Sequence, residues 1–228
     1  MGLERLTERV CYYPHKTDTD RPLLAYIKGA KYTLAVDAGN SAAHVDEFYA
    51  ALEAEGLHTP DFTAITHWHW DHTFGMHHIA GISIAHKNTN AHLLCEREKQ
   101  SKTVYTDELK LQNEFIAREY SPNKEIIVVP ADIDFAGSLT INLGGLSALL
   151  YHVEAPHTDD TVLIYIPEEK VLFLGDATSE DYDRNGYMDK AKLGSLINEI
   201  EKVECRYCVL SHAEPLEKRD LLDYLYAL

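Results

Sequence analysis

His67-Trp68-His69-Trp70-Asp71-His72 places four side chains that can bind a metal within one short stretch. The run before it, Phe62-Thr63-Ala64-Ile65-Thr66, is apolar and partly β-branched, so the stretch is predicted to lie just past a strand end. Side chains alternate sides in extended backbone, so His67 and His69 project together and Asp71 follows on the same side. His72 can face a neighbouring pocket if a helix begins after Trp70. Imidazole with carboxylate suits zinc, iron or manganese, and the pattern therefore predicts two adjacent metal sites.

Four other short motifs accompany this stretch in a fixed order along the chain. They are Val36-Asp37-Ala38-Gly39 before it, and Ala155-Pro156-His157-Thr158, Leu174-Gly175-Asp176-Ala177 and Ser211-His212 after it. In residue type, order and separation the five motifs resemble those of the metallo-β-lactamase superfamily, from about residue 20 to the C-terminus. The resemblance implies an α/β fold, a four-layer αββα sandwich with mostly antiparallel sheets, whose site lies between two similar halves.

The resemblance also implies a role for each motif residue. His67, His69 and His157 would bind one metal, Asp71, His72 and His212 a second, and Asp176 would bridge both. We expect two divalent ions, zinc first, with iron or manganese as alternatives. Asp71 and Asp176 are the expected catalytic carboxylates. Asp37 is expected to hold the ligand loop by hydrogen bonds, with a purely structural turn residue as the alternative.

Departures from subfamily patterns narrow the activity that the resemblance implies. True β-lactamases of this type have Cys where this chain has Asp176, and flavin-carrying diiron relatives have Glu where it has His69. Glyoxalase II relatives add a C-terminal helical domain, whereas only 16 residues follow His212 here.

These departures favour a hydrolase in which a metal-bridging hydroxide cleaves a small carboxylic ester, lactone or thioester. A divalent ion can lower the pKa of bound water from 15.7 to about 7, which makes such a hydroxide available at neutral pH. Trp70, Tyr182 and Tyr187 are candidate substrate contacts. Two alternatives stay open, an iron-dependent oxidoreductase of the sulfur dioxygenase type and a ligand-binding or sensor protein with low turnover.

Composition indicates the class of partner. A chain of 228 residues with 45% hydrophobic residues fits one domain, residues 1–228. The net charge of −16 argues against nucleic acid, because phosphate contacts require clustered Lys and Arg. Without a long apolar run or a signal-peptide core, the chain is expected to be cytoplasmic, with a small-molecule substrate and no membrane partner. Four acidic residues are expected at the mouth of the site, namely Glu180, Asp181, Asp183 and Asp189.

Hydrophobic periodicity predicts the remaining elements. A hairpin at 23–36 should deliver Asp37 to its end, and a helix should follow from the caps at 40–41 to Gly56. Residues 88–122 are predicted to be helical and to form a lid over the site, with an ordinary outer helix as the alternative. Strands are predicted at 126–129, 139–141, 148–151, 162–166 and 171–174, and helices near 193–203 and 221–225.

Two cysteines near the C-terminus form a Cys-x-x-Cys pair, Cys205 and Cys208. This spacing can indicate redox chemistry or zinc. The surrounding run 205–210 favours instead a buried strand that leads to His212, with both thiols as small apolar residues.

Overall fold

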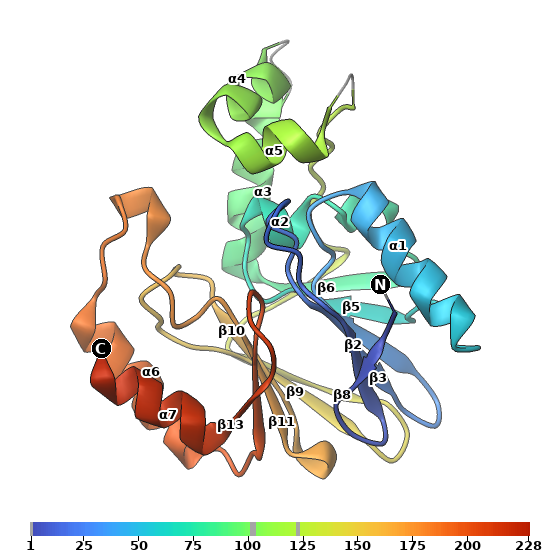
Figure 1. Cartoon of the computed structure of the whole chain (residues 1–228), viewed down its shortest axis with the longest axis vertical. Coiled ribbons are helices and arrows are strands. Elements are labelled where there is room, and N and C mark those ends of the chain that lie inside the picture. Colours follow the sequence, from blue (N-terminus) through green and yellow to red (C-terminus); the bar gives the residue numbers. More distant parts are fainter. Residues whose placement is uncertain (1, 101–103, 122–123) are drawn as a thin grey trace.

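The computed structural model describes residues 2–100, 104–121 and 124–228. Across these ranges two sheets pack face to face, and helices cover the outer face of each sheet (Figure 1). This arrangement is the αββα sandwich expected from the sequence. No helix in the same ranges is long and apolar enough to cross a membrane.

The N-terminal sheet changes from antiparallel to parallel pairing along its width. Pairing is antiparallel from β1 to β4 and parallel from β4 to β7. In sheet order its strands are β1 (Glu4–Arg5), β2 (Val10–Tyr13), β3 (Leu24–Lys28), β4 (Thr33–Val36), β5 (Phe62–Ala64), β6 (Ile82–His86) and β7 (Ile133–Phe135). The predicted hairpin is thus β3 and β4, and Asp37 follows it directly.

The C-terminal sheet is antiparallel except where β11 and β12 run parallel. Its strands, in sheet order, are β13 (Leu216–Glu217), β12 (Tyr207–Leu210), β11 (Val171–Gly175), β10 (Val162–Ile166), β9 (Ser147–His152) and β8 (Ser138–Asn142). Antiparallel pairs therefore predominate over the two sheets together, as predicted.

Helices cover the outer faces because alternate residues of each strand point away from the interior. The α-helices are α1 (Ala42–Ala54), α2 (Trp70–Thr73), α3 (Lys87–Gln100), α4 (Tyr105–Gln112), α5 (Glu114–Glu119), α6 (Lys190–Lys202) and α7 (Lys218–Ala227). Short 3₁₀ turns are η1 (Met76–His78), η2 (Pro167–Glu169) and η3 (Tyr182–Arg184). Ser41 caps α1 by accepting the His44 N–H, as its position in the sequence predicted.

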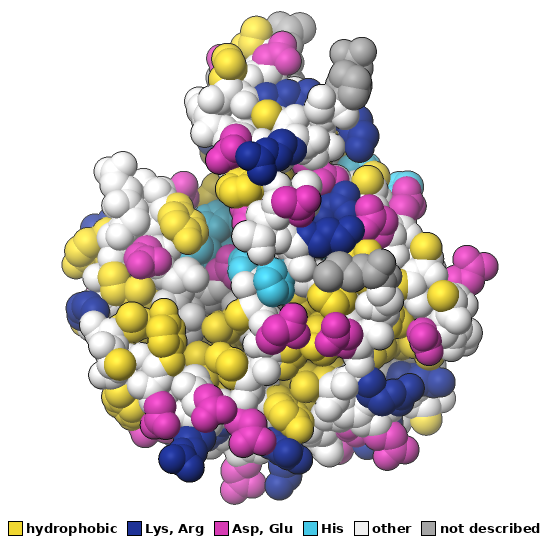
Figure 2. All heavy atoms as spheres, viewed as in Figure 1, with side chains coloured by type: hydrophobic (Ala, Val, Ile, Leu, Met, Phe, Trp, Pro, Cys, Tyr) yellow, Lys and Arg dark blue, Asp and Glu magenta, His cyan; other side chains and the backbone are white. Residues whose placement is uncertain are grey.

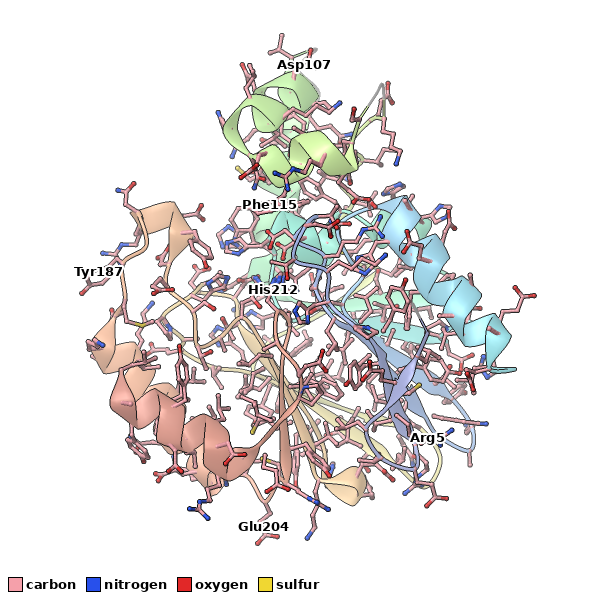
Figure 3. All side chains as sticks on the ribbon, viewed as in Figure 1. Arg5, Asp107, Phe115, Tyr187, Glu204 and His212 are labelled. Atoms are coloured by element: carbon pink, nitrogen blue, oxygen red, sulfur yellow. The ribbon has the colours of Figure 1, made fainter. Side chains whose placement is uncertain are left out.

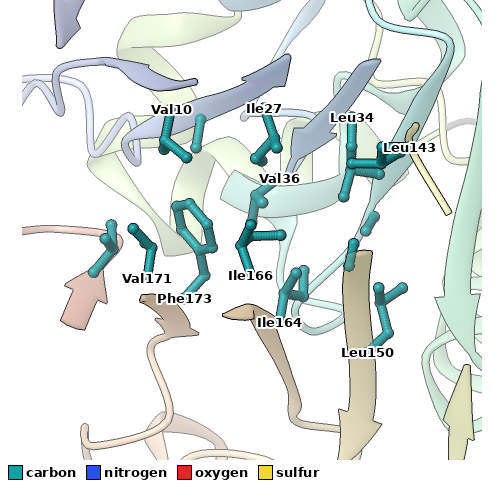
Figure 4. Packing of buried hydrophobic residues seen from close by; sticks show 14 of the residues in the cluster. Val10, Ile27, Leu34, Val36, Leu143, Leu150, Ile164, Ile166, Val171 and Phe173 are labelled. Atoms are coloured by element: carbon teal, nitrogen blue, oxygen red, sulfur yellow. The ribbon is translucent and has the colours of Figure 1, made fainter. Parts of the chain in front are cut away.

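The main core lies between the two sheets and consists mostly of branched aliphatic side chains, with a few aromatic rings among them (Figure 4). Val10, Ile27 and Leu34 from the first sheet meet Ile164 and Phe173 from the second, and all five are almost fully buried. Burying such a side chain stabilises the fold by about 1.5–3 kcal/mol. This core fixes the two sheets relative to each other, and so it also fixes the loops at their ends.

The described residues of the segment 88–122 are mostly helical, as predicted, and belong to α3, α4 and α5. Residues 101–103 and 122 of this segment lie outside the described residues. Figure 1 shows α4 and α5 projecting beyond one end of the sandwich. Glu119, at the end of α5, is tied to the body by a buried pair with Arg21 at 2.7 Å. The lid role remains a prediction.

The strand predicted at 126–129 is wrong. This stretch belongs to no strand and bonds instead to side-chain amides of α3. The amide of Gln100 donates to the Ile126 carbonyl at 2.6 Å and accepts the Val128 N–H at 3.0 Å. Asn90 contacts both backbone groups of Ala131 in the same way. Because backbone groups must be paired when they are buried, these amides replace a sheet partner.

Candidate metal centre

The predicted ligands lie in loops at one end of the sandwich. His67 follows β5, His157 lies between β9 and β10, Asp176 follows β11 and His212 follows β12. His69 is the N-terminal boundary of α2, with ψ of 151°, and the helix then turns Asp71 and His72 inward. This is the change of direction that the sequence required.

The seven residues form two adjacent clusters. Ligand atoms of His67, His69 and His157 lie within 4.8 Å of one another, and those of Asp71, His72, Asp176 and His212 do likewise. His212 lies near the centre of the view, beyond the ends of the strands (Figure 3).

Asp176 lies between the clusters. Its Oδ2 atom is 3.4 Å from His72 Nε2, 3.3 Å from His212 Nε2 and 3.9 Å from His157 Nε2. A carboxylate in this place can reach both clusters, which is the geometry expected of a bridging ligand.

Among the described residues, two buried imidazole nitrogens in the centre have no partner in hydrogen-bonding geometry. They are the Nε2 atoms of His67 and His72, whose residues are 1% and 0% exposed, and the second of them lies 3.0 Å from the Asp71 carboxylate. Buried polar atoms in folded proteins are nearly always paired. Nitrogens that point into a cluster of His and Asp side chains are instead suited to coordinate a cation, so the residues present fit a metal.

Hydrogen bonds behind the clusters fix the imidazole orientations. Asp37 has φ of 63° and accepts the N–H and hydroxyl of Thr66 and, at 2.8 Å, the Nδ1–H of His72. His157 donates its Nδ1–H to the Glu180 carbonyl at 2.7 Å. Donation from Nδ1 leaves Nε2 as the free ligand atom, and such partners tune metal affinity.

Gly175 allows the β11 loop to pass close to Thr66. Its φ is +57°, and a Cβ atom there would come within 2.7 Å of Thr66 Oγ1. A larger residue would separate Asp176 from the loop that carries His67.

Charge differs between the two clusters. Burial lowers the pKa of His67, and it lowers the pKa of His69 to about 3, so these imidazoles are neutral. Burial alone would raise the pKa of Asp71 and Asp176, but His72 and His212 hold both well below the usual value. The same carboxylates outweigh burial at His212 and raise its pKa to about 10. The neutral imidazoles of the first cluster and the ionised carboxylates of the second are both donor types that divalent transition metals prefer.

The predicted substrate contacts occupy different surroundings. Tyr182 stands edge-on to the His157 ring at 5.6 Å between centroids. Trp70 packs against Phe74, and Tyr187 lies under Arg184. Figure 3 places Tyr187 at the outer edge of its loop, away from His212. Of the three, Tyr182 is the one that directly contacts a residue of the clusters.

The predicted acidic mouth is divided between two roles. Asp183 Oδ2 lies 4.0 Å from His69 Nε2, and Glu180 lines a cavity beside the clusters. Asp181 and Asp189 instead cap η3 and α6.

His77 and His78 lie outside both clusters. His77 bonds to the Phe74 carbonyl, and His78 pairs with Asp46.

Asp20 is an acidic neighbour that the sequence did not reveal. Its Oδ1 atom lies 3.6 Å from His212 Nδ1, and its backbone φ is 53°. No motif marks the loop that carries Asp20. The one signal in the sequence is that this Asp lies within a charged stretch.

Comparison with known proteins agrees with this geometry. The sequence profile of the Metallo-beta-lactamase superfamily matches residues 24–212. No protein with a curated description matches the chain in sequence.

Solved structures share the whole fold at low sequence identity. A metallo-beta-lactamase from Pontibacter korlensis is 17% identical, with a TM-score of 0.68 over 99% of both chains. The DIM-1 metallo-beta-lactamase is 18% identical, with a TM-score of 0.69 over 99% of this chain and 95% of its own. A variant of the sec-alkyl sulfatase PisA1 is 15% identical, with a TM-score of 0.65 over 99% of this chain and 40% of its own.

The family match spans most of the chain and includes all seven residues of the two clusters. The order of the motifs, the sandwich and the paired clusters at its end agree with that match. The chain belongs to the metallo-β-lactamase superfamily.

Proposed function

We propose that this protein is a metal-dependent hydrolase of small carboxylic esters, lactones or thioesters. The observation that carries the proposal is the pair of adjacent clusters with Asp176 between them. Divalent ions held there would lower the pKa of water and stabilise negative charge on a carbonyl oxygen. We expect zinc in both positions and a cytoplasmic protein.

The chain's own residues supply orientation and charge. Asp37 and the Glu180 carbonyl hold His72 and His157 with Nε2 inward, so the imidazoles need no rearrangement. Asp71 and Asp176 provide the negative charge that balances bound cations. Both carboxylates contact His72 and His212, which keeps them ionised at neutral pH.

A cavity beside the clusters limits substrate size. Its volume is about 310 Å³, near the lower end of the roughly 300–1,000 Å³ that small-molecule sites occupy. Asp176 and His212 line one part of it, and its apolar lining includes Met188, Leu210 and Tyr224. Such a wall accommodates the acyl or alkyl part of a small ester.

Charge near the site disfavours polyanions. Asp183 and Asp20 lie beside His69 and His212. Figure 2 shows histidine and acidic side chains together where the projecting helices meet the sandwich. For a substrate with one negative charge or none, the attraction to bound metals would be the largest electrostatic interaction at contact range. A polynucleotide would have to place many phosphates against the acidic groups without the counterion release that clustered cations provide.

A substrate panel on metal-replete protein tests the proposal. We expect about two transition ions per chain and turnover of esters, lactones or thioesters, but none of a short RNA at low salt. Asp176→Ala should lower ion content and turnover together, whereas His78→Ala, an exposed histidine paired with Asp46, should change neither. Efficient RNA cleavage without carboxylic turnover would overturn the substrate class. Full metal content and turnover in Asp176→Ala would remove the bridging role.

A further inference from the structure

The cysteines of the Cys-x-x-Cys stretch lie close together on the side of the C-terminal sheet that faces α6 and α7. Cys205 Sγ and Cys208 Sγ are 3.8 Å apart, within hydrogen-bonding distance for sulfur. Cys208 is buried in the cluster beneath α6 and α7, whereas Cys205 precedes β12 and is partly exposed. The sequence favoured two thiols acting as small apolar residues of a buried strand, but in the structure only Cys208 of the two is buried.

Cys205 opens into a surface groove of about 500 Å³. Three cationic side chains line it, Arg206, Lys218 and Arg219, together with the acidic Glu217 and Asp223. Each arginine is paired with one of those acids, at 3.3 Å and 3.7 Å. The Lys218 ammonium instead bonds to the backbone carbonyls of Glu201 and Val203. In a chain with a net charge of −16, the lining of this groove has three cations against two acids, so a small anion that entered it would meet net positive charge beside a thiol.

We propose that Cys205 and Cys208 are a redox-active dithiol, oxidised by small anionic disulfides that enter this groove. Cys205 is the attacking thiol, and Cys208 is the resolving thiol. This reactivity is independent of the metal centre.

The surroundings of Cys205 favour its thiolate. The hydrogen bond with Cys208 is the largest cause that lowers the pKa of the Cys205 thiol, and the charge of Lys218 lowers it further. The same hydrogen bond and burial raise the pKa of Cys208. A lowered pKa increases the fraction of the reactive form, since the thiolate is the nucleophile.

The reaction balances as two thiol–disulfide exchanges. The Cys205 thiolate attacks one sulfur of the small disulfide, an S–S bond breaks, and one small thiolate leaves. Cys208 then loses its proton and attacks Cys205 Sγ in the mixed disulfide, which releases the second small thiolate. The protein loses two electrons and two protons, and the small disulfide gains them as two thiols. The sulfur atoms need to move together from 3.8 Å to about 2 Å.

The backbone around the pair allows this movement with little effect on the sheet. Cys208 is fixed in β12 opposite Leu172 of β11. Cys205 lies in the turn before β12, where its N–H bonds to the Val203 carbonyl. A displacement of the Cys205 side chain therefore leaves the strand pairing intact.

Peptide mapping after exposure to oxidised glutathione tests the proposal. Trypsin cuts after Lys202, Arg206 and Lys218, so a bond between the two thiols joins peptide 203–206 to peptide 207–218. We expect this linked peptide in the wild-type protein, and its loss after dithiothreitol treatment. Cys95 is exposed, so it is the internal control for simple mixed-disulfide formation.

Variants separate the two roles. Cys208→Ala should accumulate a lasting glutathione adduct at Cys205, because the resolving thiol is gone. Its Cys205 should also react more slowly with iodoacetamide at neutral pH, since the loss of thiolate is only partly offset by higher intrinsic nucleophilicity. Cys205→Ser should leave Cys208 unmodified. Circular dichroism confirms that each variant is folded.

Two results would overturn the proposal. The first is a lasting glutathione adduct on wild-type Cys205 with no linked peptide. The second is an unreacted Cys205 under conditions that modify Cys95.

Discussion

Asp37→Asn is the sharpest test of how the chain positions its ligands. The Asp37 carboxylate accepts the Thr66 N–H at 2.8 Å and the His72 Nδ1–H at 2.8 Å, and it is 2% exposed. Asparagine tolerates the left-handed backbone found here and keeps one oxygen for Thr66. Its amide N–H₂ would face the Nδ1–H of His72, and two hydrogen-bond donors cannot bond to each other. His72 must then lose its partner or change tautomer.

The structure sets the size of the expected effect. A hydrogen bond to a charged group contributes about 1.5–3 kcal/mol, and loss of such a partner costs roughly 10–100-fold in metal affinity. Asp37→Ala would in addition leave the buried Thr66 N–H unpaired and force alanine to positive φ. Its total cost of roughly 4–8 kcal/mol is comparable to the whole stability of a domain, so the asparagine variant is more informative.

Competition with a chromogenic chelator measures metal affinity, and urea unfolding of metal-free protein measures stability. Asp61→Asn is a matched control, because Asp61 also accepts an N–H and a hydroxyl from one threonine, Thr33, but contacts no imidazole. We expect Asp61→Asn to change stability alone. Unchanged metal affinity in a folded Asp37→Asn protein would show that Asp37 does not orient His72.

Two further predictions concern the loop and helices above the site. Glu119→Ala removes the two hydrogen bonds that buried Arg21 donates to this carboxylate but leaves its pair with Glu47, so it should lower the free energy of unfolding by about 1.5–3 kcal/mol. Glu114→Ala on the same helix, at an exposed pair, should cost less than about 1 kcal/mol in urea titration. Equal losses would refute the anchoring of α5. Burial alone would raise the pKa of Glu47, but hydrogen bonds from Lys16 and Arg21 lower it to about 2. Its contribution to stability is therefore complete above its ordinary value of 4.5 and is lost as pH falls toward 2. Glu47→Gln should flatten this part of the stability curve measured by denaturation, and an unchanged acid limb would contradict the assignment.

The sequence by itself predicted which residues gather in the two clusters and which strands precede them. One short stretch of sequence contains His67, His69, Asp71 and His72, so a strand end followed by one helical turn is sufficient to place them. Local backbone geometry of this kind can be predicted from sequence. The hairpin before Asp37 is legible for the same reason. The core strands were predicted because alternation of side chains is a local property too.

Tertiary structure decided everything that depends on pairing between distant segments. Gln100 supplies the backbone hydrogen bonds that a strand at 126–129 would have made to a neighbouring strand. No local sequence pattern predicts that the side chain of a helix residue will make them. Asp20 reaches His212 only because the two sheets pack across their core. Cys205 and Cys208 are close in sequence, yet their 3.8 Å separation and unequal burial follow from the turn before β12 and from the packing of α6 and α7. Contacts of this kind are set by how whole elements pack, and burial then decides which polar groups must find each other.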